Sequence, residues 1–232
     1  MPDHTDIYRN QTHLYDRMIS RQPGLAERID RIRPHEGLDI VDLGAGTGRL
    51  TAVLAPKAAS VTALDASSGM LEVTASKLRQ AGLTNWRCTA ADHRSLPLED
   101  GSADLLVCGW SLCYLAGPDV PGWEANVAQA LAEMRRVLRP GGTLILLETM
   151  GTGTEVPDPP AFLKPYYALL TQKYGFAHET FRLDYTFESL KEAEETARFF
   201  FGEDLAAKTT RNNWVTLPEC AGVWWLHMPA GA

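Results

Sequence analysis

Short apolar runs alternate with amphipathic stretches through the first two thirds of the chain. The runs have the length of strands, and the stretches between them repeat apolar residues at helical spacing. We predict strands over residues 39–43, 61–65, 86–90, 103–110 and 143–148, and helices over residues 47–55, 67–80 and 123–138. Strands that alternate with helices of this length predict a parallel sheet that helices cover on both faces.

Residues at the ends of these segments support the predicted boundaries. Ser67 is expected to cap the second helix, and Gly82 lies just beyond the end of that helix. The third predicted helix stops at the turn Arg139-Pro140-Gly141-Gly142, which we expect to start the fifth strand.

The two ends of the chain have a different pattern. Residues 151–160 are rich in Gly, Pro, Thr and Asp, which predicts a loop. After it we predict helices over residues 161–174 and 188–201, and strands over residues 181–187 and 223–228. The first 35 residues predict two helices, one up to about Ser20 and one between Pro23 and Ile32. These helices have no place inside the sheet, so they are expected to pack across it.

Composition and charge narrow the possible partners. The chain has 232 residues, 45% of them hydrophobic, so we expect it to fold around a buried core. Its 22 basic and 29 acidic residues give a net charge of −7, which argues against binding to a nucleic-acid backbone. No stretch approaches the roughly 18 apolar residues that a membrane span needs, and residues 1–10 lack the apolar core of a signal peptide. We therefore expect a cytoplasmic protein with neither a nucleic-acid nor a membrane partner.

The four cysteines give no sign of a metal site. Cys88, Cys108, Cys113 and Cys220 form no Cys-x-x-Cys pair and have no histidine at a metal-ligand spacing. Three of them lie in apolar or strand-like segments, where a buried free thiol is the usual state. Reduced thiols are consistent with the cytoplasm.

The most informative segment is Val41-Asp42-Leu43-Gly44-Ala45-Gly46-Thr47-Gly48. A predicted strand leads directly into glycines and then into a helix, which is the context of a ligand-binding glycine loop. Glycine permits a tight turn and lets a ligand approach the backbone closely. The dinucleotide pattern Gly-x-Gly-x-x-Gly would place its third glycine at position 49, but that residue is Arg49. The pattern therefore favours a ligand without a pyrophosphate.

Acidic residues follow the next two predicted strands. Asp65 ends the second strand 65 − 44 = 21 residues after Gly44, which matches the spacing of roughly 20 residues for a carboxylate that binds ribose hydroxyls. Asp92 and His93 follow the third strand. Taken alone, an acid such as Asp92 is more often a helix cap or a surface residue. Because the carboxyl ends of parallel strands meet at one edge, the glycines, Asp65 and Asp92 should converge there.

Four segments resemble the successive motifs of class I S-adenosylmethionine (SAM)-dependent methyltransferases. They are VDLGAGTGRL, VTALDASSGML, AADHRSLPLEDGSADLLVCGWSL and VLRPGGTLILLE, and the resemblance covers about residues 38–149. The most similar group is that of small-molecule enzymes like those of ubiquinone and menaquinone biosynthesis. The resemblance implies an α/β, Rossmann-like, seven-stranded and mostly parallel sheet with an antiparallel last strand. It also implies SAM as cofactor, S-adenosylhomocysteine (SAH) as product and methylation of a small-molecule acceptor.

The same resemblance implies roles for residues at the strand ends. Asp42 would meet the amino group of SAM through water, Asp65 would bind the ribose hydroxyls, and Asp92 would accept the exocyclic amine of adenine. The other residues implied to line the cofactor are Gly44, Ala45, Gly46, Ala66, Met70, His93, Gly109 and Trp110. The family has no universal catalytic residue.

The acceptor is expected to bind above the strand ends. We expect one domain over residues 1–232, with a helical lid over 1–35, a SAM-binding core over 38–149 and a variable acceptor-pocket region over 150–180. The candidate catalytic residues are His13 and Tyr15, in a segment that resembles the lid helix of the family, and Glu148, at the end of the fifth strand. For Tyr15, packing of an amphipathic helix on the sheet is a slightly favoured alternative.

Three other functions share part of this sequence pattern. An NAD-dependent oxidoreductase would share the first strand, the turn and the ribose acid, but Arg49 and the lack of a Tyr-x-x-x-Lys pair disfavour it. Base-amine methyltransferases that flip their target carry an Asn/Asp-Pro-Pro-Tyr/Phe motif after the fourth strand. This chain has Gly109-Trp110-Ser111-Leu112 at that position. A non-catalytic SAM-binding regulator or partner subunit would keep the same cofactor loop. The sequence leaves open this alternative, the acceptor, the methylated atom and the oligomeric state.

Overall fold

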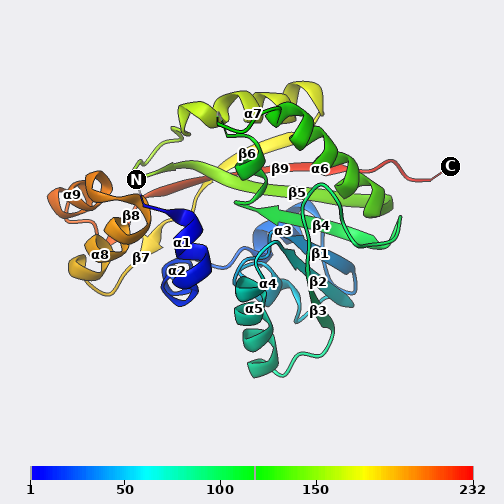
Figure 1. Cartoon of the computed structure of the whole chain (residues 1–232), viewed down its shortest axis with the longest axis horizontal. Helices are drawn as coiled ribbons and strands as arrows, with labels where there is room; N and C mark the ends of the chain where they lie inside the picture. The colour runs from blue at the N-terminus through cyan, green and yellow to red at the C-terminus, as the bar shows by residue number, and fades with distance from the viewer. Residues whose placement is uncertain (1, 118, 232) are drawn as a thin grey trace. The chain divides into compact units, whose positions relative to one another are not determined.

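The computed structural model describes residues 2–117 and 119–231 of the chain (Figure 1). Within these residues, seven strands form one sheet in the order β3-β2-β1-β4-β5-β9-β6, and β7 pairs with β8 in a second sheet. The strands are β1 (Asp39–Leu43), β2 (Ser60–Asp65), β3 (Trp86–Ala90), β4 (Ala103–Gly109), β5 (Leu138–Thr152), β6 (Ala177–Arg182), β7 (Tyr185–Thr186), β8 (Thr216–Leu217) and β9 (Glu219–His227).

Helices connect most of these strands. The α-helices are α1 (His4–Asn10), α2 (Thr12–Ile19), α3 (Ala26–Ile32), α4 (Thr51–Leu54), α5 (Ser68–Gln80), α6 (Trp123–Val137), α7 (Lys164–Ala168), α8 (Leu190–Phe201) and α9 (Glu203–Arg211). The 3₁₀ turns η1 (Leu112–Leu115) and η2 (Ala161–Leu163) and the π-helical turn η3 (Leu169–Lys173) complete the set.

The sheet is parallel except at its last strand. β1 pairs in parallel with β2 and β4, and the pairs β2–β3 and β4–β5 are parallel too. Along β9 the partners on β5 run in the opposite direction, because the Met228 N–H donates to the Gly142 carbonyl and the Gly153 N–H donates to that of Pro218. The predicted Rossmann-like sheet of seven strands with an antiparallel last strand is confirmed.

The central strands form the core because they are apolar along their whole length. The side chains of β4 and β5 from Leu105 to Cys108 and from Leu144 to Leu147 are completely buried, as are Leu43 and Leu64. Strands covered on both faces need such continuous apolar runs, and each large side chain that is fully buried contributes roughly 1.5–3 kcal/mol. This packing fixes the carboxyl ends of β1, β2 and β4.

The contacts divide the chain into two compact units. The core unit comprises the described residues of 25–148, 160–179 and 223–232, and the α8–α9 unit comprises those of 1–24, 149–159 and 180–222. In the core unit, α5 packs against β2 and β3, where Leu71 lies in one cluster with Ala45, Ala63 and Cys88. Figure 1 shows α6 along β5 and α5 beside β3.

The α8–α9 unit has an apolar core of its own, and α1 and α2 are part of this unit. One cluster of its buried residues comprises Met18, Ile19, Tyr185, Phe187, Ala193 and Leu217. The predicted lid over residues 1–35 therefore falls into both units, because α3 lies in the core unit. That residues 1–232 act as one domain stays a prediction.

Some predicted boundaries are wrong. The helix predicted over residues 47–55 begins only at Thr51, because Gly48 has a left-handed φ of +84° that no α-helix contains. The strand predicted over residues 181–187 is two strands, since β6 ends at Arg182 and β7 belongs to the other sheet. The fourth strand, predicted over residues 103–110, ends at Gly109, because Trp110 has a left-handed φ of +51°. The fifth strand extends beyond residues 143–148 at both ends.

Candidate functional site

Three glycines shape the turn between β1 and α4. Gly44, Gly46 and Gly48 have left-handed φ angles of +71°, +55° and +84°. A residue with a side chain loses roughly 1–2 kcal/mol in this conformation, so glycine suits all three positions. The Gly44 and Ala45 N–H groups both donate to the Leu64 carbonyl, at 2.7 and 2.9 Å, and this pair of bonds fastens the turn to the end of β2.

The glycines differ in what lies next to them. A Cβ on Gly44 would lie 2.0 Å from the Ser111 Oγ and 3.3 Å from the His93 Nε2, and one on Gly48 would lie 3.0 Å from the Thr74 side chain. A Cβ on Gly46 would have no heavy atom within 4 Å. Gly44 and Gly48 thus leave space for the neighbouring side chains of Ser111 and Thr74. Gly46 instead has an open backbone that a ligand can approach.

Asp65 connects the end of β2 to this open backbone. Its Oδ2 accepts a hydrogen bond from the Gly46 N–H at 2.8 Å, and its Oδ1 accepts one from the Ser67 N–H at 2.8 Å. A carboxylate has about four lone-pair sites, so both oxygens can accept further hydrogen bonds from hydroxyl groups. The neighbouring Ala66 is exposed, and Met70 is buried in the first turn of α5.

Asp42 is buried at the end of β1 and binds the first residue of α4. The Thr51 N–H and Oγ1 both donate to the Asp42 Oδ2, at 2.8 and 2.5 Å. Burial raises the pKa of Asp42 to about 7 against the effect of these hydrogen bonds, and the charge of Asp65 raises it further. The water-mediated contact predicted for Asp42 stays a prediction, because the hydrogen bonds of Asp42 described here go to α4.

The residues after β3 form two polar pairs. Asp92 is exposed and accepts a bidentate contact from Arg94, with the Nε 2.9 Å from Oδ1 and the Nη2 2.8 Å from Oδ2. Arg94 lowers the pKa of Asp92 to about 2. The His93 Nε2 lies 2.9 Å from the Ser111 Oγ, and burial lowers the pKa of His93. The sequence pattern gave no signal for Ser111, whose contact with Gly44 depends on the path of the loop after β4.

Trp110 follows the end of β4 and packs against Arg49. Its N–H donates to the Leu147 carbonyl at 2.6 Å, and its ring lies 4.0 Å from the guanidinium carbon of Arg49. This distance is typical of a cation–π contact. A Cβ on the neighbouring Gly109 would lie 3.1 Å from Leu50. Arg49, which replaces the third glycine of the dinucleotide pattern, is therefore packed on the Trp110 ring.

The structure places the three catalytic candidates in different surroundings. Glu148 is completely buried, and its Oε1 accepts hydrogen bonds from the Cys113 N–H at 3.0 Å and the Tyr166 hydroxyl at 3.2 Å. Burial raises the pKa of Glu148 to about 7. Through Oε1 these contacts hold the loop after β4 and the helix α7. The catalytic role of Glu148 stays a prediction.

The other two candidates belong to the α8–α9 unit. His13 is exposed on α2. The Tyr15 ring packs edge-on against Tyr8, with 5.2 Å between the ring centroids, and lies 5.6 Å from Phe200. These rings belong to α1 and α8 and not to the sheet on which the structural alternative placed Tyr15. The catalytic roles of both residues stay predictions.

Residues 2–117 and 119–231 contain neither a cluster of metal ligands nor a helix suited to cross a membrane. Among these residues, no three His, Cys, Asp or Glu side chains are grouped so that they could hold a metal ion. No helix in the same part of the chain combines the length and apolarity that a membrane crossing requires.

Comparison with known proteins gives consistent matches. Residues 41–146 match the methyltransferase-domain family. The chain is 30% identical over 180 residues to the ubiquinone/menaquinone biosynthesis C-methyltransferase of Psychromonas ingrahamii, covering 71% of this chain and 67% of that protein. It is 32% identical over 152 residues to the protein of the same name from Idiomarina loihiensis, covering 64% of this chain and 52% of that one.

The fold matches solved structures as well. The YcgJ protein of Bacillus subtilis superimposes with a TM-score of 0.62 over 89% of this chain and 98% of its own, at 17% identity. That identity supports the fold alone. The chain spans about half the length, or less, of several curated relatives, with shares of 22%, 52% and 43%.

Proposed function

Since the chain belongs to the class I SAM-dependent methyltransferases, we propose that it transfers the methyl group of SAM to a small-molecule acceptor and releases SAH. The observation that carries this proposal is the hydrogen bond between the Gly46 N–H and the Asp65 carboxylate at 2.8 Å. It joins the open backbone of the glycine turn to the carboxylate that would bind a ribose. The quinone-biosynthesis relatives named above support a small molecule as the acceptor.

The hydrogen-bond acceptors and the open backbone around the turn fit SAM. Gly46 offers backbone with open space beside it, and Asp65 has free lone pairs for the two ribose hydroxyls. Asp42 adds a second carboxyl group on the side of the cationic methionine moiety. We assign the cofactor site to Asp42, Gly44, Ala45, Gly46, Asp65, Ala66, Met70, Asp92, His93, Gly109 and Trp110.

SAM, when bound, supplies a methyl group on a sulfonium that is already activated for displacement. The protein then has to hold the acceptor in line with this methyl group at about 3 Å and to exclude water. Trp110 is suited to exclude water, because its backbone is fixed to Leu147 and its ring is stacked with Arg49. His13, Tyr15 and Glu148 remain the candidates for contact with the acceptor, and Glu148 also accepts the Cys113 N–H of the loop after β4.

We also propose that the chain acts as a single cytoplasmic domain without a nucleic-acid partner. The net charge of −7 supports this, since phosphate backbones bind clustered basic residues. The free thiols of Cys88, Cys108, Cys113 and Cys220 are consistent with a reducing compartment.

Calorimetric titration with SAM, SAH and NADH tests the proposed function. We expect SAM and SAH to bind with micromolar or better affinity and Asp65→Ala to weaken both at least tenfold, about 1.4 kcal/mol. Glu72→Ala, an exposed acid on α5, is the matched control and should bind like the wild type. Binding of NADH in place of SAM would contradict the proposal. Tight SAM binding without methylation in an acceptor screen would instead indicate a non-catalytic SAM-binding protein.

A further inference from the structure

The connection between β3 and β4 carries the proposed adenine-side residues Asp92 and His93. Residues 91–102, all of which the structure describes, form no helix, and a single β-bridge between Asp92 and Ser95 is their only ladder pairing. A loop of this length has many backbone N–H and C=O groups that need partners from elsewhere. What holds this loop therefore determines where Asp92 and His93 lie.

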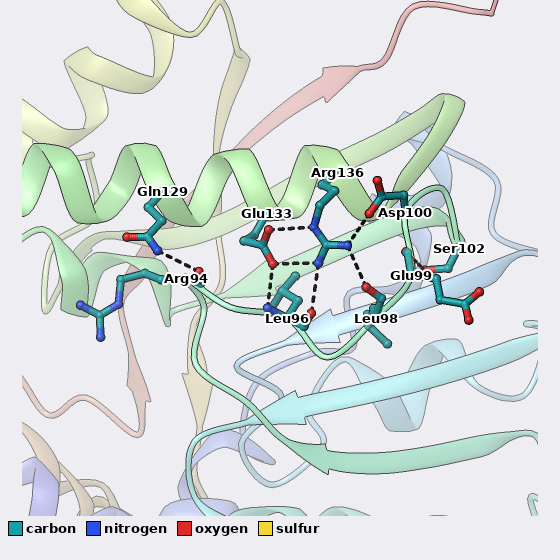
Figure 2. Close-up of polar contacts among 9 residues, drawn as sticks. All are labelled: Arg94, Leu96, Leu98, Glu99, Asp100, Ser102, Gln129, Glu133 and Arg136. Carbon is teal, nitrogen blue, oxygen red and sulfur yellow. Dashed lines mark hydrogen bonds and ion pairs between the residues drawn. The ribbon is translucent and has the colours of Figure 1, made fainter.

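One face of α6 supplies these partners. Asn126, Gln129, Glu133 and Arg136 are spaced by three, four and three residues, so they lie along one side of the helix. We call these four residues the α6 polar stripe. The Gln129 side chain donates to the Arg94 carbonyl at 3.1 Å, and the Glu133 Oε2 accepts from the Leu96 N–H at 2.8 Å (Figure 2).

Arg136 makes the densest set of contacts in the stripe. Its Nε and Nη2 donate to the two Glu133 oxygens at 2.7 and 2.8 Å, and Nη2 also donates to the Leu96 carbonyl at 3.0 Å. Its Nη1 donates to the Leu98 carbonyl at 2.8 Å and to Asp100 at 2.7 Å. A guanidinium has five N–H donors, and all five have a partner here, as Figure 2 shows. The hydrogen bonds to Glu133 and Asp100 raise the pKa of Arg136, so it stays charged.

The stripe also reaches Asp92 through one intermediate residue. The Arg94 guanidinium donates to the Asn126 Oδ1 at 3.1 Å. Its Nε and Nη2 also donate to the two oxygens of the Asp92 carboxylate. Arg94 is therefore held by α6 through both its carbonyl and its side chain. The lone pairs of Asp92 that Arg94 leaves free can still accept from an amine.

We propose that the α6 polar stripe, with Arg136 as its main positioning residue, fixes the β3–β4 loop so that Asp92 selects the exocyclic amine of the adenine ring. This inference rests on the proposed function, because it requires an adenosyl ligand at the glycine turn. It makes selectivity for the base depend on a helix face, and none of the four residues of that face belongs to the proposed cofactor site.

The test compares two ligands that differ only at the base. SAH carries the exocyclic amine, and S-inosylhomocysteine carries a carbonyl in its place, so the ratio of their affinities measures recognition of the amine. We expect the wild type to prefer SAH at least tenfold. Arg136→Met should weaken SAH binding at least tenfold while S-inosylhomocysteine binding changes less than threefold. Arg135→Met, an exposed neighbour on α6, is the matched control and should keep the wild-type ratio.

A second, milder variant tests the same inference if Arg136→Met does not fold. Gln129→Ala removes only the hydrogen bond to the Arg94 carbonyl and should lower the preference for SAH two- to fivefold. Equal weakening of both ligands, an unchanged ratio in the folded variants, or a wild type without preference would each overturn the inference. A wild type that binds neither SAM nor SAH would instead overturn the proposed function.

Discussion

Gly44 and Gly46 share a left-handed backbone but differ in what an added methyl group would contact. At Gly44 the methyl would overlap the Ser111 side chain, whose Oγ and Cβ would lie 2.0 and 2.3 Å away. We expect Gly44→Ala to lower the free energy of unfolding by about 2 kcal/mol or more, from backbone strain and overpacking together. Urea unfolding measures this loss. Ser111→Gly in the same chain should recover part of it, and no recovery would contradict the assigned clash.

Gly46→Ala should affect the ligand more than the fold. No heavy atom lies within 4 Å of the added methyl group, so only the backbone strain of roughly 1–2 kcal/mol remains. The methyl group would, however, stand on the surface where we place the methionine part of SAM. We expect at least a tenfold loss of SAM affinity by calorimetry at a temperature where the variant is folded. Unchanged affinity would mean that the ligand does not approach this face.

Glu148 should make stability depend on pH. Burial raises its pKa from 4.5 to about 7, so between these values the folded state binds more protons than the unfolded state. Stability should therefore fall as pH rises from about 4.5 to 7 and should not fall further above that range. The total is on the order of 3 kcal/mol, at about 1.4 kcal/mol per pKa unit.

Glu148→Gln isolates this contribution, because glutamine keeps an acceptor for the Cys113 N–H and cannot ionise. We expect urea unfolding at pH 5 and pH 8 to show a smaller decrease for the variant than for the wild type. Asp42, whose pKa is raised in the same direction, contributes equally to both proteins and cancels in the difference. Parallel pH profiles of the two proteins would refute the assignment.

The sequence was sufficient to predict those site residues that lie directly after a strand. The spacing of 21 residues between Gly44 and Asp65 indicated a shared site, and the structure joins Asp65 to the glycine turn by a direct hydrogen bond. Ser111 and Arg94 escaped prediction because their contacts depend on loop paths, which no periodicity encodes. Glu148 was predicted at the end of the fifth strand, but β5 continues to Thr152 and Glu148 lies inside it. Its contacts go to Tyr166 and Cys113, which are distant in sequence.

At the scale of elements, the cap of α5 can be tested directly. The Ser67 Oγ accepts a hydrogen bond from the Met70 N–H at 3.3 Å, as the sequence predicted for a helix N-cap. We expect Ser67→Ala to cost about 1 kcal/mol of unfolding free energy. Ser68→Ala, one residue into the helix, is the control and should cost less. Equal losses in urea unfolding would show that Ser67 does not act as a cap.

Elements were predictable where local pattern and tertiary pairing agree. β1, β3 and α6 lie within one residue of their predicted bounds, and β1 and α6 have the buried apolar residues that a strong local pattern predicts. The segment after Phe181 alternates like one strand, yet β6 and β7 lie in different sheets. Their partners, β9 and β8, come at least 30 residues later, and a local pattern contains no information about pairing over that distance.

At the scale of the whole molecule, the seven-stranded sheet with its antiparallel last strand followed from the resemblance of residues 38–149 to a known family, and the two units did not. The α8–α9 unit gathers residues from three separate parts of the chain, 1–24, 149–159 and 180–222. Its core forms between Met18, Phe187 and Leu217, which are far apart in sequence. Such contacts depend on the folded path of the chain, so composition and periodicity could not reveal the division.

The path of two strands predicts how the molecule unfolds. β5 and β9 each begin in one unit and end in the other, so loss of either strand removes structure from both. We therefore expect a single calorimetric transition. Leu217→Ala in the α8–α9 unit and Leu106→Ala in the core unit remove fully buried side chains, and each should cost about 2–5 kcal/mol. Both variants should shift the same transition, by roughly 2–4 °C per kcal/mol. Two transitions, of which each variant shifts only one, would show that the units unfold independently despite the shared strands.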